Sequence, residues 1–243
     1  MLSDEEKERY QRQLKLSQWG QAGQERLKQA TVFVAGLGGL GSAVSLYLAA
    51  AGVGCLRLCD GQTLESSNLN RQILYHETDV GDSKADRAQR QLMVRNSEIE
   101  IVACERIIQP DTVADLVADA DLIVDCLDNY ASRVILNAFA VEHGLPLVHG
   151  GVTQWFGQLT FIHSPETPCL CCLFPELKDM SVSSIVGAVA GVIGSLQALE
   201  VLKYLVSCGD LLKNRMLYWT GETMQFQERV LRKSPDCPVC GVE

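Results

Sequence analysis

A glycine-rich turn between an apolar strand and an apolar helix limits the folds open to this chain more than any other feature. Residues 31–35 are a β-branched run, residues 36–41 read GLGGLG, and residues 42–51 are apolar and helix-forming. Glycines in such a turn permit a tight bend and let N–H groups at a helix N-terminus approach a phosphate closely. This order of segments predicts a nucleotide-binding α/β fold.

Short β-branched runs alternate with helical segments along the first 150 residues. This rhythm is typical of a parallel, doubly wound sheet, and the further runs cover residues 55–59, 99–103, 121–125 and 145–149. Three later runs show partial alternation, and the last two predict a hairpin: 157–163, 215–220 and 224–232. We therefore predict a Rossmann-like doubly wound mixed sheet whose parallel N-terminal half is extended by antiparallel strands.

Length and composition favour one domain. The chain has 243 residues, of which 47% are apolar, enough to bury one sizeable core. We predict a single domain over residues 1–243, with a polar helical arm at 1–28 that covers the sheet or reaches a partner subunit. A nucleotide-binding part follows at 29–165, and the sequence SPETP at 164–168 leads into a zinc-binding and antiparallel part at 166–243.

The formal net charge of −9 gives no electrostatic reason to bind nucleic acid or an anionic membrane surface. The N-terminus is charged where a secretory signal needs an apolar core, so we expect a cytoplasmic protein. Residues 182–206 are apolar enough to raise the question of a membrane span. Because Gln197, Glu200 and Lys203 interrupt this stretch, we interpret it as a buried or interface helix.

An acidic residue follows the second strand at the expected distance from the glycines. Asp60 comes nineteen residues after Gly41, where a carboxylate can accept hydrogen bonds from ribose hydroxyls. This order of strand, glycine loop, helix, strand and acidic residue predicts a nucleotide-binding site. They do not identify the nucleotide, because an NAD-dependent dehydrogenase satisfies the same pattern.

Cationic and polar residues follow the acid. Residues 65–72 read ESSNLNRQ, and Lys84 ends the loop-like segment 80–84. Arginine and lysine beside a nucleotide site suit triphosphate binding and phosphoryl-charge stabilisation, which hydride transfer does not need. The alternative is that Arg71 and Lys84 are ordinary solvated charges.

Another acid lies where the fourth strand ends, in the sequence DCLDN at 125–129. Ligands bind at the carboxyl ends of strands in open α/β sheets, so Asp128 is a candidate ligand of Mg²⁺. The alternative is that Asp128 caps the helix that begins before Ser132.

Two C-x-x-C pairs predict a metal site. Cys169 and Cys172 form one pair, Cys237 and Cys240 the other, and 64 residues separate the pairs. Four thiolates suit a closed structural zinc site that clips the C-terminus back onto the chain. Cys171 is an alternative ligand within the first pair, and redox chemistry is the alternative for either pair alone.

The remaining thiols and the imidazoles give weaker signals. We interpret Cys126 and Cys208 as small packing residues. The four histidines are scattered without ligand spacing, and the sequence assigns them no role.

Taken together, these stretches resemble the MoeB/ThiF branch of the E1-like activating-enzyme superfamily along nearly the whole chain. The resemblance rests on RYQRQ at 9–13, the glycine loop at 36–41, SNLNRQ at 67–72, Lys84, DCLDN at 125–129, GVIGSLQALE at 191–200 and CPVCG at 237–241. It implies ATP-dependent adenylation of the C-terminal Gly-Gly carboxylate of a ubiquitin-like sulfur carrier, MoaD- or ThiS-like, with release of pyrophosphate. The pathway served would be molybdopterin or thiamine-type biosynthesis.

The resemblance also implies a homodimer with Mg²⁺ and ATP at each site. Arg12 would reach the phosphates of the other subunit and act in catalysis with Arg71, Lys84 and Asp128. The residues that would contact ATP or its metal are Gly36, Gly38, Gly39, Gly41, Asp60, Ser67, Asn68, Arg71, Gln72, Lys84, Asp128 and Asn129. A sulfur donor of the cysteine desulfurase or rhodanese type would then attack the acyl-adenylate.

The sequence departs from many members of this family at one place. Residues 174–185 contain no cysteine, whereas many relatives carry one there for covalent chemistry with the carrier. We therefore expect acyl-adenylate formation without a covalent enzyme–carrier step. The alternatives are an NAD(P)-dependent oxidoreductase and a non-catalytic, zinc-stabilised binding homologue.

Overall fold

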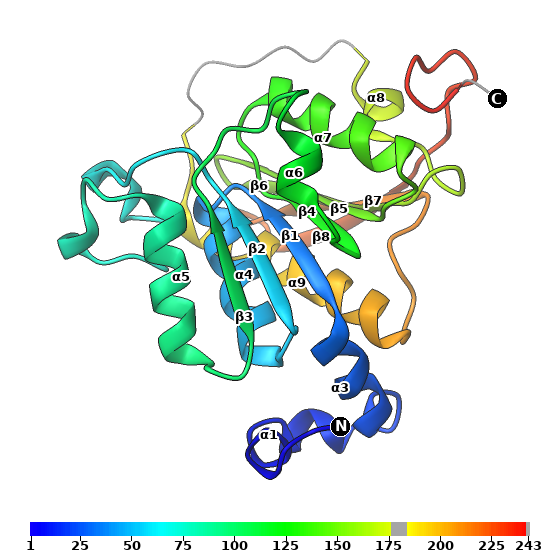
Figure 1. Cartoon of the computed structure of the whole chain (residues 1–243). Helices are drawn as coiled ribbons and strands as arrows, with labels where there is room; N and C mark the ends of the chain where they lie inside the picture. The colour runs from blue at the N-terminus through cyan, green and yellow to red at the C-terminus, as the bar shows by residue number, and fades with distance from the viewer. Residues whose placement is uncertain (176–183, 242–243) are drawn as a thin grey trace.

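The computed structural model describes residues 1–175 and 184–241. Its centre is an eight-stranded sheet in the order β3-β2-β1-β4-β5-β6-β7-β8 (Figure 1). The strands are β1 (Thr31–Ala35), β2 (Cys55–Cys59), β3 (Glu100–Cys104), β4 (Leu122–Asp125), β5 (Leu147–Thr153), β6 (Phe156–Ile162), β7 (Arg215–Thr220) and β8 (Gln225–Val230).

The α-helices connect and cover these strands. They are α1 (Asp4–Arg9), α2 (Gln11–Leu14), α3 (Gly20–Gln29), α4 (Gly39–Ala51), α5 (Lys84–Arg95), α6 (Val113–Val117), α7 (Tyr130–Glu142), α8 (Leu170–Leu173) and α9 (Gly187–Val206). Short 3₁₀ turns, η1 (Ser66–Asn68) and η2 (Glu77–Asp79), lie between β2 and α5.

Alternating side chains of β1 divide the core into two layers. Val32 and Val34 pack into a cluster with α4, α5 and α9, whereas Phe33 and Ala35 pack into a second cluster with α6 and α7. Complete burial of a side chain as large as Phe33 stabilises the fold by about 2–3 kcal/mol. Because β1 is buried on both faces, its sequence is continuously apolar.

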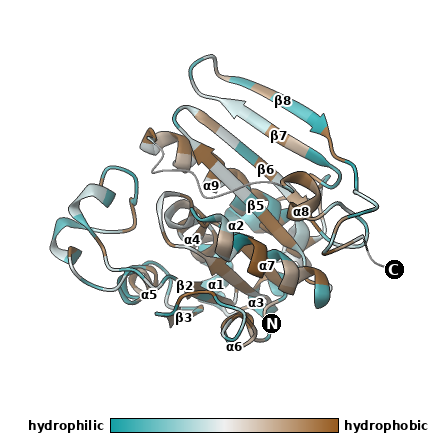
Figure 2. Cartoon of the chain, turned by 90° about the horizontal axis from the view of Figure 1, so that it is seen from above, coloured by the Kyte–Doolittle hydropathy of each residue, from teal (hydrophilic) through white to brown (hydrophobic). Residues whose placement is uncertain are grey.

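The sheet changes direction at β5, as the sequence predicts. Strands β1 to β5 pair in parallel, while β5–β6, β6–β7 and β7–β8 pair antiparallel. The hairpin of β7 and β8 is confirmed. Figure 2 shows the hydrophobic central strands and the more hydrophilic edge strand β8, which is exposed along its whole length.

The N-terminal arm packs against the C-terminal end of α4. The Tyr10 hydroxyl accepts a hydrogen bond from Asn96 Nδ2 at 2.9 Å and closes over Gly52, where an added Cβ would lie 2.5 Å from the tyrosine ring. Gly52 also has φ +87°, a backbone conformation that favours glycine. Both the close contact with Tyr10 and the positive φ therefore require glycine at this position. Gln13 ties α2 to the same place by donating to Ala51 O at 3.0 Å.

Helix α9 is long and apolar enough to cross a membrane by length and composition. It lies against α4 and strands β4 to β6, and 56% of its most apolar window is buried inside the protein. The interpretation of this stretch as a buried or interface helix therefore agrees with its packing.

Candidate functional site

The glycine turn after β1 has the geometry expected of a loop that cradles an anion. Gly36 has φ +87° and donates its N–H to Cys59 O at 2.8 Å, which ties the loop to β2. At Gly41, a Cβ would lie 2.0 Å from Gly36 O, so no other residue fits there. The loop leads directly into α4, whose first backbone N–H groups lack helical partners.

Gly38 and Gly39, the two central glycines, differ in the space around their Cα atoms. A Cβ on Gly39 would lie 2.9 Å from Ala190 Cβ of α9, so packing requires this glycine. A Cβ on Gly38 would meet only Gln72 Nε2, at 3.7 Å. The protein leaves room at Gly38, and this room is where a phosphate could approach the backbone.

Asp60 lies at the end of β2, beside this loop. Its two carboxylate oxygens accept the N–H groups of Leu37 and Gln62, each at 2.9 Å. Each oxygen keeps a further lone pair, so the half-buried carboxylate can also accept from ribose hydroxyls. The predicted placement of Asp60 next to the glycines is confirmed, while its contact with ribose remains a prediction.

Lys84 does not lie in a loop, as its sequence context suggested, but is the first residue of α5. The reason is local, since Ser83 caps the helix by accepting from Asp86 N. Lys84 is 4% exposed, and Nζ donates to Gln62 Oε1 at 2.8 Å. No carboxylate pairs with this ammonium group within residues 1–175 and 184–241.

The hydroxyl of Tyr75 links this lysine to the glycine loop. It lies 3.0 Å from Leu37 O and 3.3 Å from Lys84 O. The buried cation is therefore held beside the loop by tyrosine, glutamine and backbone groups. Neither Tyr75 nor Gln62 stood out in the sequence, because an isolated tyrosine or glutamine has no spacing that marks it.

The segment 67–72 lies along the other side of the loop. Arg71 packs against Gly39, and its Nη1 donates to Ser67 O at 2.9 Å. Asn68 is buried and closes η1 by accepting from Glu65 N. Gln72 is 3% exposed, and its Oε1 has no hydrogen-bond partner among the described residues. A buried amide oxygen without a partner is costly, which indicates that something polar belongs beside it.

Asp128 is exposed in the turn after β4, and no described residue pairs with its carboxylate. The alternative reading of Asp128 as a helix cap is wrong. Asn129 caps α7, because its Oδ1 accepts from Ser132 N at 2.9 Å. The Asp128 carboxylate is therefore free to bind a cation.

Buried charges hold this turn in place. Asp125 accepts from Leu127 N at 3.1 Å, and Arg133 Nη2 donates to Leu127 O. Burial alone would raise the pKa of Asp125, but the Arg133 charge and a hydrogen bond from His149 hold that pKa below its usual value. His149, which had no role in the sequence-based prediction, has its Nδ1 2.7 Å from Asp125 Oδ2. Its position at the end of the β-branched run 145–149 was the available signal.

Among the residues predicted for the nucleotide site, Arg12 lies apart from the glycine loop. It is exposed on α2, which contacts the C-terminal end of α4 through Gln13, whereas the glycine loop is at the N-terminal end. A helix of 13 residues is about 20 Å long, so Arg12 cannot reach the loop of its own chain. Figure 1 shows this arm at the foot of the molecule.

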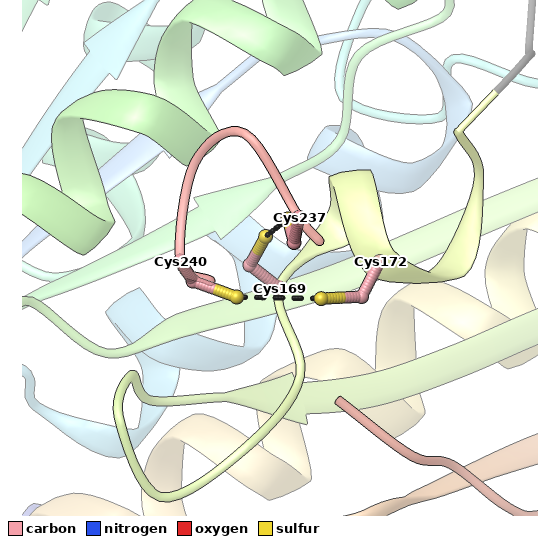
Figure 3. A group of neighbouring side chains, drawn as sticks. All are labelled: Cys169, Cys172, Cys237 and Cys240. Atoms are coloured by element: carbon pink, nitrogen blue, oxygen red, sulfur yellow. Dashed lines mark hydrogen bonds between the residues drawn. The ribbon is translucent and has the colours of Figure 1, made fainter. Parts of the chain in front are cut away.

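The four predicted metal ligands come together (Figure 3). Cys169 and Cys237 have sulfurs 3.6 Å apart, Cys172 and Cys240 have sulfurs 3.3 Å apart, and all four lie within 4.8 Å of one another. Tetrahedral Zn²⁺ with bonds of about 2.3 Å places its sulfurs about 3.8 Å apart. The cluster therefore fits zinc in both donor type and spacing.

Two neighbouring groups orient these ligands. Ser234 N donates to Cys172 Sγ at 3.4 Å, and a hydrogen bond from the Cys171 thiol lowers the pKa of the Cys169 thiol. A lowered pKa favours the thiolate that a metal binds. Cys171 itself lies outside the group of four and accepts from Asn137 Nδ2 at 3.6 Å.

The nucleotide loop and the four-cysteine cluster lie in a chain that is similar to known proteins along most of its length. The model of the ThiF family matches residues 10–239. The chain belongs to the ThiF family. The resemblance predicted from the sequence motifs is confirmed.

Relatives in the ThiF family match nearly all of this chain. "Adenylyltransferase and sulfurtransferase MOCS3" of Mus musculus is 42% identical over 99% of this chain. The matched region is 54% of that relative, so this chain spans about half of its length. "Sulfur carrier protein adenylyltransferase" of Thermus thermophilus is 39% identical over 98% of this chain and 92% of its own length. "SAMP-activating enzyme E1" of Haloferax volcanii is 37% identical over 96% of this chain and 88% of its own length.

Solved structures agree with the ThiF-family fold. A structure of E. coli MccB with ATP superposes with a TM-score of 0.80 at 27% identity, covering 90% of this chain and 68% of that chain. PaaA superposes with a TM-score of 0.82 at 23% identity over 96% of this chain and 85% of that chain. The overall fold of this chain is therefore similar to the folds of MccB and PaaA.

Proposed function

We propose that this ThiF-family chain uses ATP to adenylate the C-terminal Gly-Gly carboxylate of a ubiquitin-like sulfur carrier, releasing pyrophosphate. The family match and the relatives named as adenylyltransferases support this proposal. The same relatives speak against the nicotinamide oxidoreductase alternative. The presence of Arg12, Arg71, Lys84 and Asp128 speaks against a binding homologue without catalysis.

The observation that carries the proposal is the buried Lys84 ammonium group beside the glycine loop. A charged group removed from water without a counterion is strongly unfavourable. Its only described partner is the neutral Gln62 amide. An anionic ligand would supply the missing charge, and the open backbone at Gly38 gives its phosphates a place next to this cation.

The cationic residues of the site would stabilise the charge that develops in the adenylation reaction. Two anions must approach, since the carrier carboxylate attacks the α-phosphorus while charge grows on pyrophosphate. Arg71 and Lys84, with Arg12 of a second copy, offset that repulsion. No side-chain base or nucleophile is needed, because a carboxylate is already ionised at neutral pH.

The Asp128 carboxylate would hold Mg²⁺, and its exposed oxygens without described partners fit that task. When bound, the ion would neutralise part of the triphosphate charge. Asp60 would bind the ribose, and the remaining contacts to ATP would come from Gly36, Gly39, Gly41, Ser67, Asn68, Gln72 and Asn129. Zinc on the four cysteines would be structural, since four thiolates leave no open position.

The functional unit would be a homodimer. Helices α4 and α9 pack side by side on one face, and each still exposes a large apolar side chain there, Tyr47 at 56% and Leu199 at 52%. A helix that is apolar on all sides is expected to be buried, so a second copy would cover this face. The remote arm that carries Arg12 would then serve the neighbouring site.

The adenylate would be consumed by a sulfur donor of the cysteine desulfurase or rhodanese type, for molybdopterin or thiamine-type biosynthesis in the cytoplasm. A thioester step on this chain has no support among the described residues. The thiol nearest the Asp128 turn is Cys126, and burial raises its pKa well above the ordinary value. The cysteine-free segment 176–183 lies outside the described residues.

The test is exchange of radioactive pyrophosphate into ATP with MoaD- and ThiS-like carriers that end in Gly-Gly. We expect carrier-dependent exchange, and we expect Lys84→Gln to lower kcat by about 100-fold or more. Lys213→Gln, whose side chain pairs with the exposed Glu166, is the matched control and should keep wild-type kcat. Wild-type exchange by Lys84→Gln, or no exchange with any carrier of this class, would overturn the proposal.

A further inference from the structure

A network of hydrogen-bonded polar side chains extends from the Asp128 turn to the surface of β6. Asp125 contacts His149, and His149 Nε2 lies 3.2 Å from Gln158 Nε2. Asp125 is fully buried and His149 is 1% exposed, while Gln158 is half-buried. The proposed adenylation chemistry assigns no task to His149 or Gln158.

The hydrogen bonds of this network can be assigned donors and acceptors in one consistent way. The Asp125 carboxylate only accepts, so His149 must carry a proton on Nδ1. Burial lowers the pKa of His149 and keeps the ring neutral, so Nε2 is an acceptor. The Gln158 amide nitrogen must then donate to it, which fixes the orientation of the whole amide.

This orientation leaves two groups of Gln158 unused. Among the described residues, the contact with His149 is the one hydrogen bond of this side chain, so its Oε1 and its second N–H have no partner there. Together they form one acceptor and one donor, which match the N–H and C=O of a peptide backbone. Gly151 lies opposite Gln158 in the β5–β6 register, and a Cβ there would approach Gln158 Nε2 to 3.2 Å. Glycine therefore keeps this side of the amide open.

The half-buried Gln158 amide is close to the candidate reaction site. Arg133 Nη2 donates both to Leu127 O, in the Asp128 turn, and to Gly150 O at 2.9 Å. One guanidinium nitrogen thus joins the turn after β4 to the glycine pair of β5. A peptide whose terminal carboxylate lies at that turn would extend past Gly151 and Gln158.

We propose that Gln158, held by His149 and Asp125, binds the peptide backbone of the carrier's C-terminal tail. A Gly-Gly tail offers no side chains, so its recognition must depend on backbone groups. His149 is then a positioning residue that acts through Gln158. This inference rests on the proposed function and names residues that select its protein substrate.

The test compares carrier and ATP dependence in three variants. Gln158→Leu should raise the KM for the carrier about tenfold, because two hydrogen bonds to the tail are lost, and should leave kcat and the KM for ATP within about twofold. His149→Phe should act in the same direction. In the double variant, His149→Phe should add less than about twofold, because its effect passes through Gln158.

Controls separate positioning from a folding defect. Zinc content and the KM for ATP should stay unchanged, and Gln21→Leu on the exposed surface of α3 should leave the carrier KM unchanged. An unchanged carrier KM in Gln158→Leu would overturn the inference, as would additive effects in the double variant. Calorimetric binding of the carrier without ATP tests the same contact if the wild type shows no exchange. Equal affinity of wild type and Gln158→Leu would then overturn it independently of the adenylation proposal.

Discussion

At the scale of single residues, His149 couples the fold to pH. Its pKa is lowered in the folded protein by burial, while an unfolded chain has the ordinary value of about 6.5. As pH falls below 6.5, the unfolded state takes up a proton that the folded state does not. Stability therefore falls with falling pH in this range. Asp125 has a lowered pKa, so its contribution is lost only in more acidic solution, below about 3.8.

We predict that His149→Phe flattens this dependence. Between pH 6.5 and 5 the wild type should lose up to about 1.4 kcal/mol of unfolding free energy per pH unit more than the variant. Urea unfolding at pH 7.5, 6.0 and 5.0 measures this difference. Zinc is common to both proteins. His163→Gln, whose ring bonds only Gly144 O in the described structure, controls for the loss of one imidazole. Parallel curves for wild type and His149→Phe would contradict the prediction.

Residues with a fixed sequence spacing were the ones that sequence analysis could find. The glycines, Asp60, Asn68 and the four cysteines stand at characteristic distances in known motifs. Gln62 and Gln158 do not, because their importance arises from partners distant in sequence, such as Lys84 and His149. Only the folded chain brings such pairs together.

At the scale of elements, the strands and their parallel or antiparallel directions followed from the sequence, while boundaries moved by up to four residues. The fifth strand begins at Leu147 instead of 145, since Pro146 has no N–H to give a neighbouring strand. Lys84 moved from an expected loop to the start of α5, because Ser83 is a helix cap. These differences depend on local capping and not on the overall pattern.

The zinc cluster joins two distant elements and gives a prediction at this scale. Cys172→Ser should reduce bound zinc to well below one ion per chain and lower the Tm by several degrees, because about 64 residues would no longer be closed into a loop. Cys171→Ser is the matched control and should keep both zinc and Tm, since its sulfur lies outside the group of four. Metal analysis and calorimetry measure both outcomes, and zinc loss in Cys171→Ser would reassign the ligand.

At the scale of the whole molecule, the proposed site would be incomplete within one chain. Arg71, Lys84 and Asp128 surround the glycine loop, while Arg12 lies about one helix length away. The apolar face of α4 and α9 is where a second copy would bring its arm into reach. Sequence could suggest this arrangement only by resemblance, because no spacing within one chain shows which subunit a side chain serves.

Mixing two inactive variants tests whether Arg12 acts across a dimer. Arg12→Ala and Arg71→Ala should each lose pyrophosphate exchange as homodimers. If Arg12 serves the other subunit, a mixed dimer has one site with both arginines and one site with neither. Random exchange of subunits makes half of all dimers mixed, so about a quarter of wild-type activity should return. An arginine acting within its own chain would give no recovery, because every site would still lack one of the two. The recovered activity therefore distinguishes the two arrangements directly.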